Sequence, residues 1–421
     1  MRGQIRCCWF LALALSTLSA TWAEAQEWTR FRGPNGTGLG QATGLPAKWT
    51  DQDYNWKAKL PGEGHSSPVV WGQKIFLLSA DPQTAMRYLL CLSAQDGGEL
   101  WRREFPSETH RLHQRNTYAS STPAVDAERV YAAWSTPAQV TLRAFDHAGQ
   151  DVWQVDLGQD VSEHGFGCSP ILFEDLVILS NSQQETELEQ DQEPGQSYLL
   201  AYDAKTGQLR WRTPRVSVRV CYSTPCIYQP AGGPAELICT NTGDGLYSLD
   251  PRTGQENWKA SKAFSMRVVN SPVIAGGLLF GSTGSGGGGN YVTAVRPGKP
   301  PQTAYTLKNA APYVPTLVAQ DDLLFLLNDK GVVSCVNPST GEDYWRERVG
   351  QAFSGSPIIA DGKLYCTSDE GLVVVLAAAK TFRLLGENPL GEPTRATPAV
   401  SGGRLYFRTK SQLFSIGGKK T

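Results

Sequence analysis

The nine residues "NPSTGEDYW" at 337–345 recur in nearly the same form elsewhere in the chain, and this repetition is the main indication of the fold. In this pattern an Asp or Asn side chain can accept a hydrogen bond from its own backbone, and the Gly four residues later takes a positive φ. The pattern therefore predicts a tight turn followed by a strand that carries a Trp. The other copies are "DAKTGQLRW" at 203–211, "DPRTGQENW" at 250–258, and the looser "SAQDGGELW" at 93–101 and "DHAGQDVW" at 146–153.

A second repeated element lies upstream of each turn. It reads as a small residue, one further residue, Pro, a few apolar residues, a turn and an aromatic residue, as in "GSPIIADGKLY", where eight residues lead from Pro357 to Tyr365. The copy at 314–325 is shifted by about one residue. The copies begin at Pro68, Pro123, Pro170, Pro225, Pro272, Pro315, Pro357 and Pro398. This spacing of about 40 to 55 residues indicates eight structural repeats.

Each repeat reads as four short strands. Pro is tolerated at the start of a strand because no ladder hydrogen bond is lost there. "ADG", "AGG" and "SGG" are turns of the kind that join the first two strands of a hairpin. Four strands per repeat at this period are typical of a propeller blade. The sequence therefore predicts an all-β fold, an eight-bladed β-propeller of four-stranded antiparallel blades.

The two ends of the chain indicate how the ring closes. The last repeat has only three strands, whereas "NWKAKL" at 55–60 looks like a fourth strand with its Trp56 and precedes the first complete repeat. We expect this N-terminal strand to complete the last blade, which removes an open edge. Tryptophans on the fourth strands are predicted to fill the gaps between blades, with Tyr305 and the region near Phe382 replacing them in blades five and seven. These structural residues are Trp56, Trp101, Trp153, Trp211, Trp258 and Trp345.

The first 25 residues differ from the rest of the chain. Arg2 and Arg6 precede an apolar run, and "AEA" at 23–25 places small residues before Gln26. This pattern predicts a signal peptide cut after Ala25, with export to the periplasm or the extracellular space. A membrane anchor or a lipoprotein is the alternative, although the apolar run is shorter than a span of ~20 residues. The expected division is a signal peptide at 1–25, an N-terminal arm at 26–54, the propeller at 55–417 and a basic tail at 418–421.

Charge and cysteine content exclude several classes of partner. The net charge of −1 gives no reason to expect a nucleic acid, and no segment after the first 25 residues is apolar enough to span a membrane. The seven remaining cysteines match no zinc or haem spacing, so we expect no metal site. Cys91 and Cys335 occupy a slot that holds Ala201 and Ser248 in other repeats, which predicts buried small residues. We expect a monomer.

The small-x-Pro start, the "DxxTGxxxW" turn and the repeat period resemble the pyrroloquinoline-quinone-like (PQQ-like) β-propeller proteins. The stretch "WTRFRGPNGTG" at 28–38 is similar to the opening of exported members of that group. The resemblance covers nearly all of the chain after the first 25 residues. It implies either a scaffold like BamB or a quinoprotein alcohol dehydrogenase, because both use this fold.

A binding site is expected where the loops before the first strands surround the mouth of the central channel. Rigid scaffolds commonly carry binding residues on such loops. The alternative is that these polar residues only solvate exposed loops. The candidates are His65, His113, Arg115, Asn116, Tyr118, His164, Arg219, Tyr222, Arg267, Asn270 and Arg395, with His110 and Arg111 nearby. Because histidines titrate near neutrality, we expect an anionic partner to bind more strongly as the pH falls toward about 6.

Two further loops have unusual composition. The acidic run "QQETELEQDQEPGQ" at 183–196 lacks the spacing of a calcium loop and is predicted to be solvated and mobile. The glycine-rich "GSTGSGGGG" at 281–289 lacks the Lys-Ser/Thr of a phosphate loop and is predicted to be a flexible connector.

The choice between scaffold and enzyme depends on residues that the resemblance would require. Quinoprotein dehydrogenases are longer and use a disulfide between adjacent cysteines and a calcium ion held by Glu and Asn near a catalytic Asp. Beyond residue 25 the chain has no adjacent cysteines and no matching Glu, Asn and Asp set. We therefore expect a non-catalytic scaffold without a cofactor that binds a protein or a small anionic ligand at the channel mouth. The alternative is a PQQ-dependent dehydrogenase with quinone and calcium.

Overall fold

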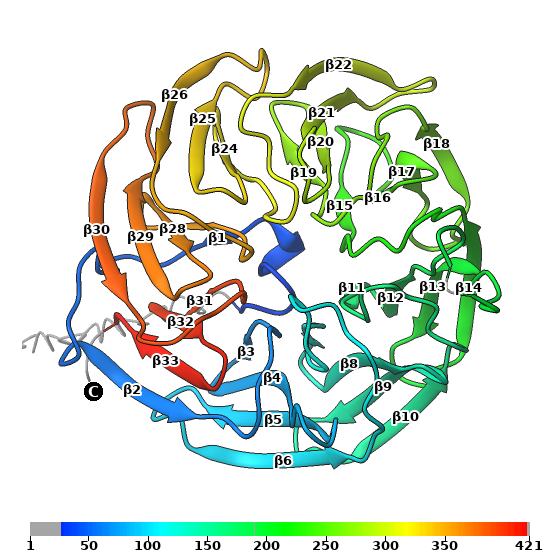
Figure 1. Cartoon of the computed structure of the whole chain (residues 1–421), viewed down its shortest axis with the longest axis horizontal. Helices are drawn as coiled ribbons and strands as arrows, with labels where there is room; N and C mark the ends of the chain where they lie inside the picture. Colours follow the sequence, from blue (N-terminus) through cyan, green and yellow to red (C-terminus); the bar gives the residue numbers. More distant parts are fainter. Residues whose placement is uncertain (1–26, 189, 419–421) are drawn as a thin grey trace, which may run out of the picture.

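The computed structural model describes residues 27–188 and 190–418, which form eight blades of four antiparallel strands arranged in a ring, one of them with a fifth, parallel strand at its inner edge (Figure 1). The predicted eight-bladed β-propeller is confirmed. Blades one to four comprise β3 (Val69–Trp71), β4 (Lys74–Ala80), β5 (Arg87–Ser93) and β6 (Glu99–Phe105); β7 (Ala124–Val125), β8 (Arg129–Thr136), β9 (Gln139–Asp146) and β10 (Asp151–Asp156); β11 (Ile171–Phe173), β12 (Leu176–Asn181), β13 (Ser197–Asp203) and β14 (Leu209–Arg215); and β15 (Cys226–Tyr228), β16 (Glu236–Asn241), β17 (Gly245–Leu249) and β18 (Glu256–Ala260).

Blades five to eight follow the same plan. They comprise β19 (Val273–Ala275), β20 (Leu278–Thr283), β21 (Tyr291–Arg296) and β22 (Gln302–Leu307); β23 (Val318–Gln320), β24 (Leu323–Leu327), β25 (Val332–Val336) and β26 (Asp343–Arg348); β27 (Ile358–Ala360), β28 (Lys363–Thr367), β29 (Leu372–Ala377) and β30 (Leu384–Pro389); and β31 (Ala399–Ser401), β32 (Arg404–Arg408) and β33 (Gln412–Ile416) with β2 (Tyr54–Lys59). The first strand of each blade lies nearest the centre, and the fourth lies at the rim (Figure 1).

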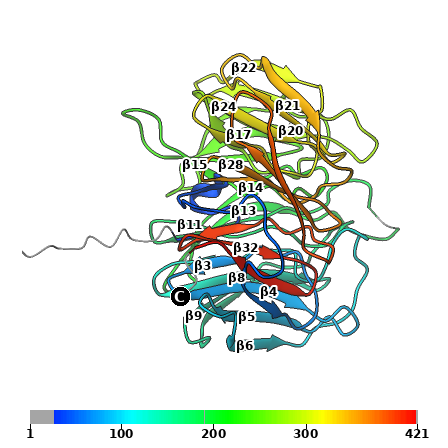
Figure 2. The same cartoon turned by 90° about the vertical axis from the view of Figure 1, so that its left-hand side faces the viewer.

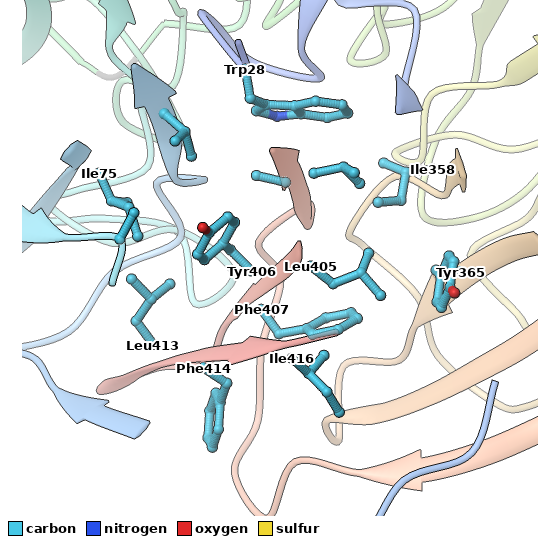
Figure 3. Packing of buried hydrophobic residues seen from close by; sticks show 14 of the residues in the cluster. Trp28, Ile75, Ile358, Tyr365, Leu405, Tyr406, Phe407, Leu413, Phe414 and Ile416 are labelled. Atoms are coloured by element: carbon cyan, nitrogen blue, oxygen red, sulfur yellow. The ribbon is translucent and has the colours of Figure 1, made fainter. Parts of the chain in front are cut away.

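The ring closes in the last blade, as predicted. β2 pairs antiparallel with β33, and Trp56 lies opposite Ser415. The seam is a single apolar cluster that joins blades one, seven and eight, with Ile75, Tyr365 and Phe407 among its buried members (Figure 3). Because this cluster includes residues from both ends of the described chain, closure is stabilised by side-chain burial as well as by strand pairing.

The repeated turn and the repeated Trp meet across the blade boundary. The indole of Trp153 lies on Gly207 of the next blade, and its Nε1 donates to the carbonyl of Ala204 in the same turn at 3.0 Å. A Cβ at Gly207, where φ is 70°, would lie 2.7 Å from the indole. The same arrangement joins Trp56 to Gly97, Trp101 to Gly149, Trp211 to Gly254, and Tyr305 to Gly341. The turn therefore needs Gly both for its backbone conformation and for the neighbouring ring.

A belt of hydroxyl groups encircles the channel at the start of the first strands. In seven of the eight junctions between described blades, the backbone N–H of a Ser or Thr donates to the hydroxyl of its counterpart in the next blade at 2.9–3.1 Å. The belt runs through Ser67, Thr122, Ser169, Thr224, Ser271, Thr316, Ser356 and Thr397. This explains the small polar residue of the repeat and its one-residue shift in blade six, where Thr316 follows Pro315.

The N-terminal segment is more than an arm, because residues 28–40 enter the middle of the ring. The backbone of Trp28 pairs with Val70, the short 3-10 turn η1 (Pro34–Gly36) lies at the centre, and β1 (Leu39–Gly40) adds in parallel to β27 (Figure 1). In the side view η1 lies toward one face of the ring (Figure 2). We call residues 28–40 the plug.

Two buried arginines attach the plug to the channel wall. Arg30 Nη2 donates to the carbonyl of Pro225 at 2.5 Å, and Arg32 Nη2 donates to that of Leu317 at 2.6 Å. Burial lowers the pKa of Arg30 to about 10 and that of Arg32 to about 9. The plug is thus held by hydrogen bonds to blades four and six.

The cysteines beyond residue 25 are all buried and free, in agreement with the small-residue interpretation. Burial raises the pKa of Cys91 and of Cys335 to about 12, so these thiols stay protonated at neutral pH. The predicted signal peptide at 1–25 and most of the basic tail lie outside the described residues. Among the described residues, no helix has the length and apolar character needed to cross a membrane.

Candidate functional site

A cavity of about 590 Å³ occupies the mouth of the channel. Its rim is formed by the loops before the first strands, its deeper wall includes six hydroxyl residues of the belt, and Phe31 of the plug also lines it. Nine of the predicted site residues line this cavity: His65, His113, Arg115, Asn116, His164, Arg219, Tyr222, Arg267 and Arg395. They come from loops distributed around the ring, so the fold brings together residues that are far apart in sequence.

The other two predicted residues lie outside the cavity lining. The hydroxyl of Tyr118 donates to the carbonyl of His110 and stabilises the loop before β7. The amide of Asn270 donates to Ser282 and to the carbonyl of Tyr313, so it ties blade five to blade six. Their roles in this structure are to shape the loops.

Three loops meet at one carboxylate. Glu163 Oε2 accepts hydrogen bonds from Arg267 Nη2 at 2.7 Å and from Arg219 Nη2 at 3.0 Å. Arg267 is nearly buried, with 5% of its side chain exposed, whereas the Glu163 side chain is 44% exposed. Burial raises the pKa of Glu163, but the hydrogen bonds from the two arginines outweigh it and lower that pKa to about 2. Glu163 was not among the predicted residues, although it adjoins His164 in sequence.

Two of the cavity histidines, His65 and His164, are neutral near pH 6, which differs from the titration expected from the sequence. Burial, and then the charge of Arg267, lowers the pKa of His164 to about 4. His164 Nε2 accepts a hydrogen bond from Arg267 Nη1 at 2.7 Å, and its ring stacks on His113 with centroids 4.4 Å apart. Burial, and then the charge of Arg395, lowers the pKa of His65 to about 3. The positive charge of the mouth therefore comes from arginines.

The other two cavity arginines lie on the loops before β31 and β7. Arg395 Nε forms an ion pair with Asp369 Oδ2 at 3.3 Å, and Asp369 also accepts from Ser354 at 3.0 Å. Arg115 is exposed at the rim, and its backbone N–H donates to His113 Nδ1 at 3.2 Å. Among the described residues that line the cavity, four arginines face one glutamate, so the lining carries a net positive charge.

Both loops of unusual composition also contribute to the mouth, which the sequence pattern did not indicate. Gln184 accepts from the N–H of Val220, Glu185 accepts from the N–H of Ser217, and Glu187 pairs with Arg219 at 3.1 Å. Residues 183–187 therefore support the loop that carries Arg219. In the glycine-rich segment, residues 281–283 belong to β20, and Ser285 with Gly286 lines both the mouth cavity and an adjoining cavity of about 700 Å³.

The donor groups of this site suit an anion and do not fit a calcium ion. Calcium takes six to eight oxygen ligands. Among the described residues, no cluster of three or more His, Cys, Asp or Glu side chains could hold a metal ion. Glu163 is engaged by two arginines, and Asp369 by Arg395. The residues present therefore do not fit the calcium-bound quinone that the resemblance allows as an alternative.

The eight blades, the repeated Thr-Gly turn with its Trp and the loop-built central mouth define a PQQ-like β-propeller protein. A family model described as outer membrane protein assembly factor BamB matches residues 55–299 and 306–419. The chain belongs to this family.

Curated relatives match part of the chain. A tetrathionate hydrolase from Acidithiobacillus ferrooxidans is 26% identical over 258 residues, which cover 58% of this chain and 46% of the relative. The outer membrane protein assembly factor BamB of Legionella pneumophila is 24% identical over 191 residues, covering 43% of this chain and 48% of the relative. The matches thus span about half the length of these relatives.

Solved structures share the fold at low sequence identity. BamB from Moraxella catarrhalis is 13% identical with a TM-score of 0.63, covering 86% of this chain and 98% of that one. The quinohemoprotein alcohol dehydrogenase from Comamonas testosteroni is 13% identical with a TM-score of 0.66, covering 94% and 81%. Both scaffold and enzyme structures are thus similar to this chain, and the fold does not decide between their functions.

Proposed function

We propose that this protein is an exported, monomeric, non-catalytic β-propeller that binds an anionic partner in the mouth cavity. The partner is a small anion or an acidic segment of another protein. The observation that carries the proposal is the cavity lining, where four arginines face a single glutamate while His65 and His164 are neutral. Export to the periplasm or the extracellular space is supported by the pattern of residues 1–25.

Arginine is suited to this role because its planar guanidinium binds carboxylate, sulfate or phosphate groups through two parallel hydrogen bonds. The cavity of about 590 Å³ also falls within the usual size range of small-molecule sites, roughly 300–1,000 Å³. The scaffold interpretation is further supported by membership in the BamB family.

The arginines differ in how far their replacement would also destabilise the fold. Replacing Arg219, Arg267 and Arg395 together would be a poor test of binding. Arg267 is nearly buried and bonds to Glu163 and His164, so its loss would also lower the melting temperature. The cleaner pair is Arg115 and Arg395, whose side chains are more exposed than that of Arg267 and, within the described chain, form no ion pair with Glu163. Changing both to Gln should weaken binding of an anionic probe by about tenfold or more with little change in stability.

Tetrathionate is a suitable first probe, since it is the anion named in one relative, and titration calorimetry would measure its binding. A matched control is Arg252→Gln on the outer turn between β17 and β18, which removes the same kind of charge away from the mouth. Equal binding by the parent and the Arg115→Gln, Arg395→Gln double variant would argue against the proposal.

The second candidate is a PQQ-dependent dehydrogenase, favoured by the similarity to quinohemoprotein alcohol dehydrogenase. Its test is a supply of quinone and calcium followed by an assay with alcohols or sugars and an artificial electron acceptor. Turnover above the level of the free quinone would replace the scaffold proposal by this one.

A further inference from the structure

We infer that Glu163 is an internal competitor for the ligand of the mouth cavity, and that the ligand class is a carboxylate that takes the place of the Glu163 carboxylate on Arg219 and Arg267. This inference rests on the proposed anion-binding function and specifies which group of the ligand is recognised and where.

The ion pairs of Glu163 with Arg219 and Arg267 leave some hydrogen-bonding groups of all three side chains without a partner in the described chain. Every contact from a described residue to this carboxylate ends on Oε2, which receives both arginines, with His164 Nδ1 at 3.5 Å. The Nε atoms of Arg219 and Arg267 are buried without a hydrogen-bond partner in the described chain. An arginine–carboxylate pair is strongest when two parallel hydrogen bonds form. Glu163 therefore leaves donor capacity on both guanidinium groups unused.

The two arginines are better anchored than the glutamate. Arg267 belongs to an isolated β-bridge with Gly284, whose N–H donates to the Arg267 carbonyl at 3.1 Å. The Arg219 carbonyl accepts from the hydroxyl of Ser217 at 3.3 Å. Glu163 instead lies at the tip of a turn, where Ser162 accepts from the N–H of Gly165 at 2.9 Å, and its side chain is 44% exposed. A rotation of the Glu163 side chain into solvent would free Arg267 Nη2 for a ligand and would leave Arg219 with Glu187 as its remaining carboxylate partner, at 3.1 Å.

The arrangement also selects the ligand. A carboxylate has the size and charge of the group that already lies between the arginines, whereas a cation would meet Arg115, Arg219, Arg267 and Arg395. The remaining lining offers neutral donors and rings, including the hydroxyls of Ser356 and Thr397 and the rings of Tyr222 and Tyr313. These groups suit the body of an organic acid or an acidic peptide side chain.

The test compares binding of two carboxylate probes by the parent and by Glu163→Gln. Glutarate represents a free organic acid, and acetylated tetraglutamate represents an acidic peptide. Because the amide carries no charge and competes poorly for guanidinium groups, we expect Glu163→Gln to bind at least one probe about tenfold more tightly than the parent. Glu256→Gln is the control. Glu256 lies on the outer strand of blade four and pairs with Arg215 of blade three, and its replacement by Gln changes the net charge by the same amount.

Glu163→Asp covers the case in which the amide variant fails to fold. Its shorter carboxylate keeps the charge but reaches the arginines less well, so it should also bind more tightly than the parent. The inference is overturned if the parent binds a probe and the folded Glu163 variants bind it no more tightly. If the parent and all folded variants bind neither probe at millimolar concentration, the proposed carboxylate site itself is wrong. Preference for glutarate or for the peptide identifies the source of the carboxylate.

Discussion

The indole of Trp153 and the Cα of Gly207 face each other across the boundary between blades two and three, so closely that a methyl group on the glycine would lie 2.7 Å from the ring. The Trp on one blade and the turn on the next therefore form a single packing unit. Trp258 is the exception that fits this relationship, because the next blade offers it no such turn. Blade five has no Thr-Gly turn, and Trp258 Nε1 donates instead to Glu236 of its own blade at 2.8 Å.

Replacing Gly207 by Ala should destabilise the protein more than the same change at a glycine with similar backbone strain and free space. Gly362 is the matched control, with φ of 65° and no atom within 4 Å of the position that a Cβ would take. The positive φ should cost about 1–2 kcal/mol at either site, and the clash with Trp153 should add about 1–3 kcal/mol. Denaturant unfolding of both variants measures the difference.

The same pair allows a double-mutant cycle. Trp153→Ala removes the ring, at a cost of about 3 kcal/mol, so Gly207→Ala in that background should cost no more than Gly362→Ala does. Equal costs of Gly207→Ala with and without the Trp would contradict the packing unit.

The hydroxyl belt predicts that Thr397→Val destabilises the protein more than Thr397→Ser does. Thr397 Oγ1 accepts the N–H of Ser356 at 3.1 Å, and both residues are buried. Thr397→Val keeps the shape but leaves that N–H without a partner, which should lower the free energy of unfolding by about 1–3 kcal/mol. Thr397→Ser keeps the acceptor and should cost about 1 kcal/mol or less. If both variants unfold at the same denaturant concentration, the belt contributes nothing measurable.

His65 should make the fold sensitive to acid. Its pKa is lowered to about 3 in the folded protein, first by burial, whereas the unfolded chain has an ordinary value of about 6.5. Between these values the unfolded state binds the extra proton, so stability falls as the pH falls below about 6.5 and stops falling from this cause near pH 3. The loss of unfolding free energy between pH 7 and pH 5 should therefore be smaller in His65→Gln than in the parent. An equal loss in both proteins would show that His65 is not responsible.

Anion binding should be nearly independent of pH between about 6 and 8. His164 and His65 have pKa values of about 4 and 3 and remain neutral in this range, while Glu163, with a pKa of about 2, remains ionised. Binding should strengthen only below about pH 5, where protonation of His164 adds positive charge next to Arg267. Calorimetric titrations at pH 8, 7, 6 and 5 measure this. A steep increase between pH 7 and pH 6 would show that the histidines titrate near neutrality and contribute to binding.

Two deletions separate ring closure from the plug. A chain that starts at residue 61 lacks β2 and leaves β33 with an open edge, so we expect aggregation and loss of cooperative unfolding. A chain that starts at residue 41 keeps β2 but loses Phe31, Arg30 and Arg32, so it should stay folded with weaker anion binding. Light scattering during thermal unfolding compares them. Identical melting of the shorter chain and the full chain would contradict closure by β2.

The blades could be predicted because each one repeats the same local chemistry. The spacing from Pro357 to Tyr365 and the turn before Trp345 appear several times, so each copy supports the others. The plug has no second copy, and Arg30 and Arg32 bind backbone carbonyls, which any residue can provide. No pattern in the sequence marks such acceptors.

The site could be predicted only to the level of loops. Position before a first strand was enough to bring His65, Arg219 and Arg395 to one cavity. The direction of each side chain does not follow from that position, so Asn270 was included although it points to Ser282. The pairing of Glu163 with arginines from two other loops depends on the spacing of blades, which no local pattern specifies.

The plug has a consequence for the order of folding. Its residues touch blades one, four, six and seven through Val70, Pro225, Leu317 and Ile359. These four partners reach their positions only when most of the ring has assembled, since they are separated by long stretches of chain. The part of the described chain that is synthesised first must therefore remain near the growing ring and dock after most of the blades have formed. Because Phe31 lines the mouth cavity, the docking of the plug also completes the site.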